Sequence, residues 1–167
     1  MKVLILGAGA VGGYFGGRLA QGGADVTFLV RPQRAQKLAQ AGLVIKSPLG
    51  DAQIPVHTML QEAVRPDYDL VILSCKAYDL DASIASIGGA MGPNTLILPL
   101  LNGMAHLARL EQAYGSARVL GGTCYIASTL DADGGIRHLS QFQGITCGPR
   151  AGNHAHAGAL LQDLAQA

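Results

Sequence analysis

Residues 2–12 read KVLILGAGAVG, and this stretch decides the fold class. The run at residues 2–6 is apolar, as expected of a strand that a parallel sheet buries on both faces. Glycines follow at Gly7, Gly9 and Gly12, and apolar residues then recur at helical spacing. A strand, a G-x-G-x-x-G turn and a helix in this order are the parts of a dinucleotide-binding fingerprint.

Each glycine of this loop has an expected part in holding a dinucleotide. Gly7 permits the tight turn, Gly9 lets the backbone approach a pyrophosphate, and Gly12 lets helix and strand pack closely. The helix N-terminus presents free N–H groups and a positive dipole end to the phosphates. A glycine-rich turn that merely packs well is the alternative, which the surrounding strand–turn–helix–strand unit disfavours. We assign cofactor-binding roles to Gly7, Ala8, Gly9, Ala10, Val11 and Gly12.

The end of the second expected strand bears on the choice of cofactor. Residues 24–30 are apolar and β-branched, and Arg31 follows them. An NAD-preferring site places an Asp or Glu here to bind the ribose 2′-hydroxyl. Arg31 takes that place instead, and its planar fork can pair with a 2′-phosphate. An ordinary solvated cation is the alternative, but the absence of a carboxylate favours NADP over NAD.

The composition indicates one globular domain and excludes several classes of partner. With 167 residues, of which 49% are hydrophobic and 14% charged, the chain suits a sheet covered on both faces. A net charge of +1 offers no general attraction for nucleic acid or an acidic membrane. No apolar run reaches membrane-spanning length. The first strand begins at Lys2, which leaves no room for a signal peptide, so we expect a cytoplasmic protein.

The cysteines and histidines give no sign of a metal site. Cys75, Cys124 and Cys147 are widely spaced and form no C-x-x-C pair. We therefore expect reduced thiols, with neither a disulfide framework nor a zinc site. His154 and His156 alternate in a Gly/Ala/Asn-rich stretch, where we expect a solvated loop.

Beyond the second strand, helical and strand patterns alternate, as in a doubly wound sheet. Pro32 starts a helix that Gly42 ends, and residues 43–46 and 53–57 flank a turn as an inserted hairpin. From Gly122 the pattern changes to an antiparallel hairpin. The remaining expected elements are strands at 70–74, 95–100, 118–120, 123–130, 136–142 and 145–147, and helices at 78–91, 104–114 and 157–167.

Polar residues follow two expected strands at the edge where ligands bind in this fold. Lys76 can contact a phosphate, a ribose hydroxyl or a substrate carboxylate, and a solvated loop lysine is the alternative. Asn102 follows the strand where the nicotinamide is expected, and Asn also caps helices well, so we assign it both roles. Cys124 has no base at a fixed spacing, and we expect it to pack in the core or the site wall.

An ordered set of motifs over nearly the whole chain resembles ketopantoate reductase (2-dehydropantoate 2-reductase). The set begins with the glycine loop, Arg31 and the pair Lys76-Ala77. It continues with Leu101-Asn102-Gly103-Met104, with DGGIRH at residues 133–138, and with GITCGP at residues 144–149. Many dehydrogenases share the glycine loop alone, whereas the ordered set is considerably more specific.

The resemblance implies NADPH-dependent reduction of a small-molecule 2-oxo acid, 2-dehydropantoate, to pantoate in pantothenate and coenzyme A synthesis. It implies that the glycine loop holds the pyrophosphate, that Arg31 and Lys76 contact the cofactor, and that Asn102 touches cofactor and substrate. Ser128 is expected to line the cofactor site. In the family, the proton-donating lysine and the carboxylate that grips the substrate belong to an all-helical C-terminal domain. We therefore expect no catalytic residue in this chain.

These inferences combine into one α/β domain over residues 1–167. We expect a Rossmann-type, doubly wound, mainly parallel sheet with an antiparallel hairpin extension, and without the C-terminal helical domain. The pattern stops within a helix, so we interpret the chain as an N-terminal part of a larger enzyme or a truncated product, inactive alone. An unfinished sheet edge would expose apolar surface and favour a homo-oligomer. Two other functions stay open: a reductase of another 2-oxo acid, and a non-catalytic NADP(H)-sensing module.

Overall fold

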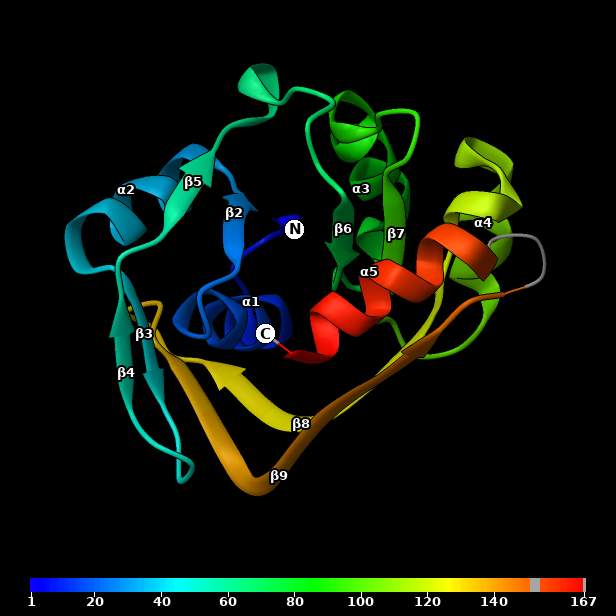
Figure 1. Ribbon diagram of the computed structural model, residues 1–167. Coiled ribbons are helices and arrows are strands. Elements are labelled where there is room, and N and C mark those ends of the chain that lie inside the picture. The colour runs from blue at the N-terminus through cyan, green and yellow to red at the C-terminus, as the bar shows by residue number, and fades with distance from the viewer. Residues whose placement is uncertain (151–153, 167) are drawn as a thin grey trace.

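Two β-sheets on either side of a central helix form the framework of the protein (Figure 1). The structure, a computed structural model, describes the backbone of residues 1–150 and 154–166 and the side chains of residues 1–150 and 157–165. The strands are β1 (Lys2–Leu6), β2 (Asp25–Leu29), β3 (Leu43–Lys46), β4 (Ala52–Ile54), β5 (His57–Met59), β6 (Leu70–Leu73), β7 (Leu96–Pro99), β8 (Gly121–Leu130) and β9 (Ile136–Gly148). The α-helices are α1 (Ala10–Gln21), α2 (Pro32–Ala41), α3 (Leu80–Ile87), α4 (Ala105–Tyr114) and α5 (His154–Gln166).

The first sheet is entirely parallel, with strand order β5-β2-β1-β6-β7. The chain moves outward from β1 in one direction and then returns to continue on its other side, which is the doubly wound order of a Rossmann-type sheet. The predicted α/β fold class is therefore confirmed. The apolar runs that predicted these strands reflect burial on both faces, as parallel sheets require.

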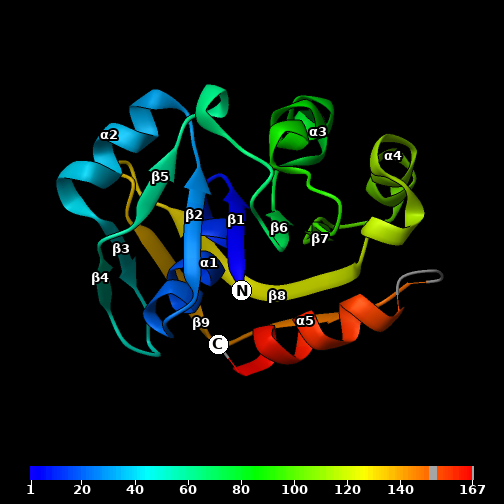
Figure 2. The same cartoon turned by 45° about the horizontal axis from the view of Figure 1, so that its top comes forward.

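Alternate residues of each parallel strand enter two different cores. Val3 and Ile5 of β1 pack in a core with α1, α5 and the second sheet, whereas Leu4 packs in a core with α3 and α4. All three side chains are fully buried. Figure 2 shows α3 and α4 together on one side of the parallel sheet and the β8–β9 ribbon with α5 on the other.

The second sheet has the order β4-β3-β9-β8 and covers α1 on the side away from the parallel sheet. The antiparallel β8–β9 hairpin confirms the predicted extension, with a register shift between Ile126 and Ser128. The hairpin assigned to residues 43–46 and 53–57 was wrong in its second strand. β4 ends at Ile54, and His57 instead begins β5, which joins the parallel sheet beside β2.

Several other boundaries differ from the prediction. Residues 136–142 and 145–147 form one strand, β9. The helix predicted at 78–91 is shorter, because 3₁₀ turns flank α3 at both of its ends. Residues 118–120 contribute a single bridge, from Val119 to Ile97, rather than a strand. His154 and His156 lie in α5 and not in a loop; their side chains are outside the described part, as is Ala167.

The edge strand β7 does not expose apolar surface. All four of its residues are buried, and the Leu120 N–H donates to the Ile97 carbonyl at 2.9 Å along this edge. The expectation of an exposed, unfinished edge was therefore wrong here. Large apolar side chains are exposed instead on the second sheet, at Leu139 and Phe142.

Candidate functional site

The glycine loop carries the chain from β1 into α1. Gly7 has φ +83°, the left-handed region that favours glycine, and its N–H donates to the Leu29 carbonyl at 2.8 Å. Gly9 is the N-cap of α1, and no side chain caps the helix. The first N–H groups of α1 therefore present the positive end of the helix dipole to the space beyond the loop.

The space around the loop differs between Gly9 and Gly12. A Cβ atom added to Gly9 would have no neighbour within 4 Å, so the loop faces open space there. A Cβ on Gly12 would collide with the Ser74 hydroxyl and would lie 3.2 Å from Cγ2 of Ile5. Gly12 thus lets α1 approach the parallel sheet, while Gly9 leaves room for a ligand. An uncapped helix N-terminus beside an open glycine turn fits the pyrophosphate of a dinucleotide.

The parallel strands end in register, which brings the segments that follow them to one edge. Leu6 of β1 lies opposite both Leu29 of β2 and Leu73 of β6. Pro99 of β7 lies opposite Leu73 in turn. Ligands bind outside this edge in open α/β sheets. The segments that begin there carry the predicted residues Arg31, Lys76 and Asn102.

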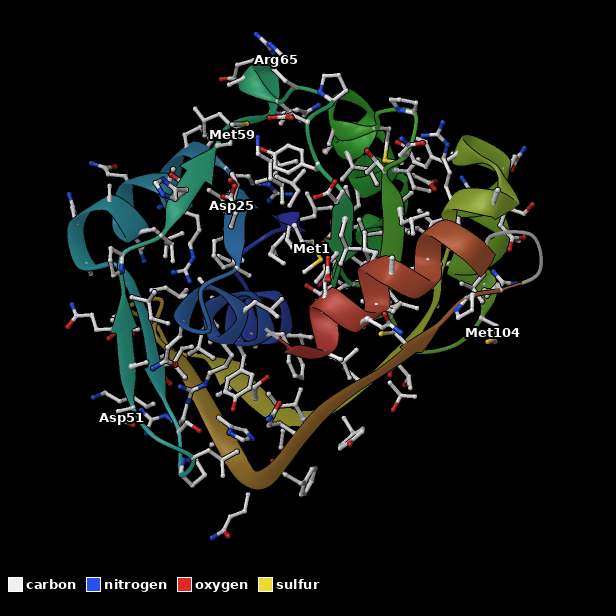
Figure 3. The ribbon with its side chains drawn as sticks, in the orientation of Figure 1. Met1, Asp25, Asp51, Met59, Arg65 and Met104 are labelled. Carbon is white, nitrogen blue, oxygen red and sulfur yellow. The ribbon has the colours of Figure 1, made fainter. Side chains whose placement is uncertain are left out.

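Arg31 is the N-cap residue of α2, directly beyond the end of β2. Its carbonyl accepts the N–H groups of Arg34 and Ala35 at 3.0 Å, which fixes the helix start. Its side chain is exposed, and within the described residues no hydrogen bond or ion pair holds the guanidinium. The one carboxylate of β2, Asp25, lies beside Lys2 at the opposite end of the strand (Figure 3). The carboxyl end of β2 therefore presents a cation and no acid.

Arg34 is a site residue that the sequence reasoning missed. Its Nε and Nη2 both donate to the Ala8 carbonyl of the glycine loop, at 3.1 and 2.7 Å, and its Nη1 donates to the Gly134 carbonyl at 2.8 Å. The side chain is half-buried, and this burial lowers the pKa of the guanidinium, which stays charged at neutral pH. In the sequence, only its position one helical turn after Arg31 indicated that Arg34 lies near the glycine loop.

Lys76 and Asn102 are both exposed near the carboxyl ends of β6 and β7. Lys76 is the N-cap of a short 3₁₀ helix that precedes α3. The capping role assigned to Asn102 was wrong, because Met104 is the N-cap of α4 and no side chain caps that helix. Two apolar side chains, Tyr78 and Met104, are also exposed in these segments, Met104 at the periphery beside α4 (Figure 3).

Ser128 lies on β8 opposite His138 of β9. Its Oγ is buried and has no hydrogen-bond partner among the described residues. His138 is itself buried and contacts Tyr14 of α1, with 4.8 Å between ring centroids. A hydrogen bond of 2.9 Å joins Nδ1 of His138 to Ser47, so a polar, hydrogen-bonded side chain lies opposite Ser128.

The cysteines behave as packing residues rather than nucleophiles. Burial raises the pKa of Cys75, Cys124 and Cys147, which keeps each thiol protonated at neutral pH. All three are free thiols, and Cys124 directs its sulfur toward the Leu100 carbonyl at 3.9 Å. The part of the chain that the structure describes contains no cluster of His, Cys, Asp and Glu suited to a metal ion. It also contains no helix of the length and hydropathy needed to cross a membrane.

The family model of ketopantoate reductase PanE/ApbA matches residues 3–152, which include the glycine loop and both arginines. This chain belongs to that family. It is 43% identical over 140 residues to the uncharacterized oxidoreductase YkpB of Bacillus subtilis, covering 84% of this chain and 46% of that protein. It is 30% identical over 158 residues to a 2-dehydropantoate 2-reductase of Nostoc sp., covering 94% and 49%. The chain thus spans about half the length of these curated relatives.

Several solved structures share the fold of this chain. The 2-dehydropantoate 2-reductase of Geobacter metallireducens superposes with a TM-score of 0.88 at 28% identity, over 99% of this chain and 55% of that one. A D-mandelate dehydrogenase in a ternary structure with NADH and anilino(oxo)acetate gives a TM-score of 0.87 at 26% identity, over 99% and 54%.

Proposed function

We propose that this chain forms the NADPH-binding part of an oxidoreductase that reduces 2-dehydropantoate to pantoate. The observation that carries the proposal is the juxtaposition of an open, uncapped glycine loop with the exposed Arg31 at the end of β2. The first feature suits a pyrophosphate, and the second suits the extra phosphate of NADP. Relatives named 2-dehydropantoate 2-reductase support the choice of substrate.

Each predicted residue has a defined part in this proposal. The loop from Gly7 to Gly12 binds the pyrophosphate through backbone N–H groups, and Arg31 binds the 2′-phosphate. Lys76 and Asn102 orient the nicotinamide half and the substrate from the ends of β6 and β7. Ser128 lines the site through its unpartnered Oγ. The cofactor, when bound, supplies the hydride, and the residues of this chain hold it in place.

The proton for the developing alkoxide is assigned to no residue of this chain. A 2-oxo acid needs both that proton and a cation for its carboxylate. Lys76 supplies a cation at the carboxyl edge, and the remaining half of a full-length relative supplies the rest of the site. Reduction of another 2-oxo acid is the second candidate, since the D-mandelate dehydrogenase structure was determined with anilino(oxo)acetate. The relatives' names favour the first.

Calorimetric titration of the chain with NADPH and with NADH tests the cofactor assignment. We expect NADPH to bind at least about tenfold more tightly, the factor that one charge-assisted hydrogen bond provides. Equal affinities would remove Arg31 from its proposed role, and preference for NADH would overturn the cofactor assignment.

A further inference from the structure

Arg34 connects the glycine loop to a turn that lies 100 residues beyond Arg34 itself in the chain. Three of its guanidinium N–H groups donate to backbone carbonyls: two to Ala8 in the glycine loop and one to Gly134 in the β8–β9 turn. A planar fork that grips one carbonyl from two sides restrains the orientation of the whole peptide unit. Both partners are backbone carbonyls, so the contact is a set of directional hydrogen bonds and not an ion pair.

The glycine at position 134 makes this connection possible. Gly134 has φ +93°, and a Cβ atom there would collide with Nη1 of Arg34. The turn itself is closed by hydrogen bonds between Asp131 and Gly134 and between Asp131 and Gly135, at 2.9 and 2.8 Å. The conformation of the turn and the absence of a side chain at Gly134 therefore leave room for the guanidinium of Arg34.

The peptide that Arg34 holds lies at the centre of the proposed pyrophosphate site. No peptide bond among the described residues is cis, so the C=O of Ala8 and the N–H of Gly9 point in opposite directions. With the carbonyl directed to Arg34, the Gly9 N–H faces away from α2. Gly9 is also the N-cap of α1, with open space beside its Cα. Because Gly9 follows this peptide, its orientation is less restricted than it would be between two residues with side chains, and the contact with Arg34 restrains it.

We propose that Arg34 is a positioning residue for dinucleotide binding, acting through the Ala8 carbonyl and coupling the glycine loop to the β8–β9 turn. This inference rests on the proposed function. Three of the five guanidinium N–H groups of Arg34 are directed to Ala8 and Gly134, so we assign the 2′-phosphate to the exposed Arg31 and not to Arg34. Its effect falls on the part of the cofactor that NADPH and NADH share.

The test compares NADPH and NADH binding to the Arg34→Lys and Arg34→Gln variants by calorimetry. Lysine retains the charge but lacks the fork, so it should not restore binding. We expect both variants to lose affinity for NADPH and NADH by the same factor, about tenfold, as expected for a lost charge-assisted hydrogen bond. Lys37→Ala, which removes an exposed cation from the same helix, should leave both affinities unchanged.

Amide hydrogen exchange in residues 131–137 provides the second readout. We expect NADPH to slow exchange in this turn in the unmodified chain, and we expect this protection to be absent in Arg34→Lys even when the variant is saturated. A merely structural role would lower thermal stability without abolishing this coupling.

The outcomes separate this inference from the proposed function. Unchanged binding by Arg34→Lys overturns the positioning role alone, as does a loss confined to NADPH, which would make Arg34 a phosphate ligand. Failure of the unmodified chain to bind either dinucleotide overturns the proposed function and this inference with it.

Discussion

Arg31 and Arg34 lie one helical turn apart, yet their surroundings give them different tasks. The guanidinium of Arg31 is exposed and is held by no hydrogen bond or ion pair within the described residues, so its charge is available to a ligand. The guanidinium of Arg34 is half-buried against the carbonyls of Ala8 and Gly134. Two identical side chains thus differ because the fold engages three N–H groups of Arg34 and none of those on the guanidinium of Arg31 within the described residues.

Replacement of Arg31 should affect one cofactor and spare the other. We expect Arg31→Ala to weaken NADPH binding by about 1–3 kcal/mol, the scale of a charge-assisted hydrogen bond, with little effect on NADH. No hydrogen bond or ion pair to the described residues holds this exposed side chain, so the melting temperature should not change. Calorimetry with both cofactors measures the difference. Equal losses for NADPH and NADH would contradict the assignment.

Replacement of Gly9 should remove cofactor binding without harm to the fold. Gly9 has φ −83°, which valine tolerates, and a Cβ there would touch nothing in the protein. The Gly9→Val side chain would instead fill the space that the pyrophosphate needs. We expect an unchanged circular dichroism spectrum and no detectable NADPH binding by fluorescence titration. A folded variant that binds normally would show that the loop is not the site.

The sequence pointed to the glycine loop and Arg31 because a local motif carries them. Arg34 has no such signal, since its task depends on Gly134, which the fold alone brings near. The prediction that Asn102 caps a helix was wrong for a similar reason. An Asn-Gly pair is a common turn signal, and the turn here places Met104, two residues later, at the start of α4.

Helix α1 approaches both sheets through a face of small residues. A Cβ on Gly16 would lie 2.8 Å from Ile5 and from the ring of Phe28, and a Cβ on Gly17 would lie 2.7 Å from Leu43. Ile5, Phe28 and Leu43 are fully buried. The glycines cost helix propensity, and close packing against both sheets offsets that cost.

One methyl group on this face should destabilise the protein. Overpacking by Gly16→Ala, less its gain in helix propensity, should lower the free energy of unfolding by about 1–2 kcal/mol. The control is Gly158→Ala in α5, where a Cβ would meet no atom within 4 Å. That variant should be neutral or slightly stabilising. Urea denaturation measures both, and equal responses would show that α1 is not tightly packed.

Helix α4 carries a buried histidine that makes stability depend on pH. Burial, together with the nearby charge of Arg150, lowers the pKa of His106 below its ordinary value of 6.5. As the pH falls below 6.5, the unfolded chain takes up a proton that the folded chain resists, so the folded state loses stability. The stabilising contribution is fully present above pH 6.5.

A histidine substitution isolates this effect from that of the other titrating groups. We expect the urea midpoint of the unmodified chain to fall more between pH 7.5 and 5.5 than that of His106→Gln. The pH values are chosen to bracket the ordinary histidine pKa of about 6.5. Parallel curves for the two proteins would show that His106 does not contribute.

Elements with a strong periodic pattern followed from the sequence, and the pairing of short strands did not. The apolar runs of β1 and β6 and the Pro32 start of α2 are local signals. Residues 53–57 carry an equally local strand signal, but it is divided between β4 and β5, which belong to different sheets. The break at Pro55 redirects the chain, and nothing local specifies which partner each half finds.

The molecule as a whole should bind cofactor without completing the reaction. The chain spans about half the length of its curated relatives. We assign protonation of the substrate to none of its described residues. We expect weak NADPH binding and no measurable reduction of 2-dehydropantoate, because the reacting atoms would stay open to water and without a proton donor. Absorbance of NADPH after addition of substrate measures this.

Turnover proportional to protein concentration, and absent in Gly9→Val, would contradict that expectation. The proton donor would then lie within these residues. Lys76, exposed at the carboxyl edge, is the first residue to replace in that case, by methionine.

The enclosure of α1 between two sheets also sets the order in which the polypeptide can acquire its structure. One wall of that enclosure is formed by β1 and its neighbours, but the other is built from β3 together with β8 and β9, far along the chain. During synthesis from the N-terminus, the ring of Tyr14 cannot make its contact with His138 until that residue has emerged from the ribosome. Contacts of such sequence separation form slowly. We therefore expect the glycine loop and α1 to reach their final packing late, although they precede the second sheet in the chain.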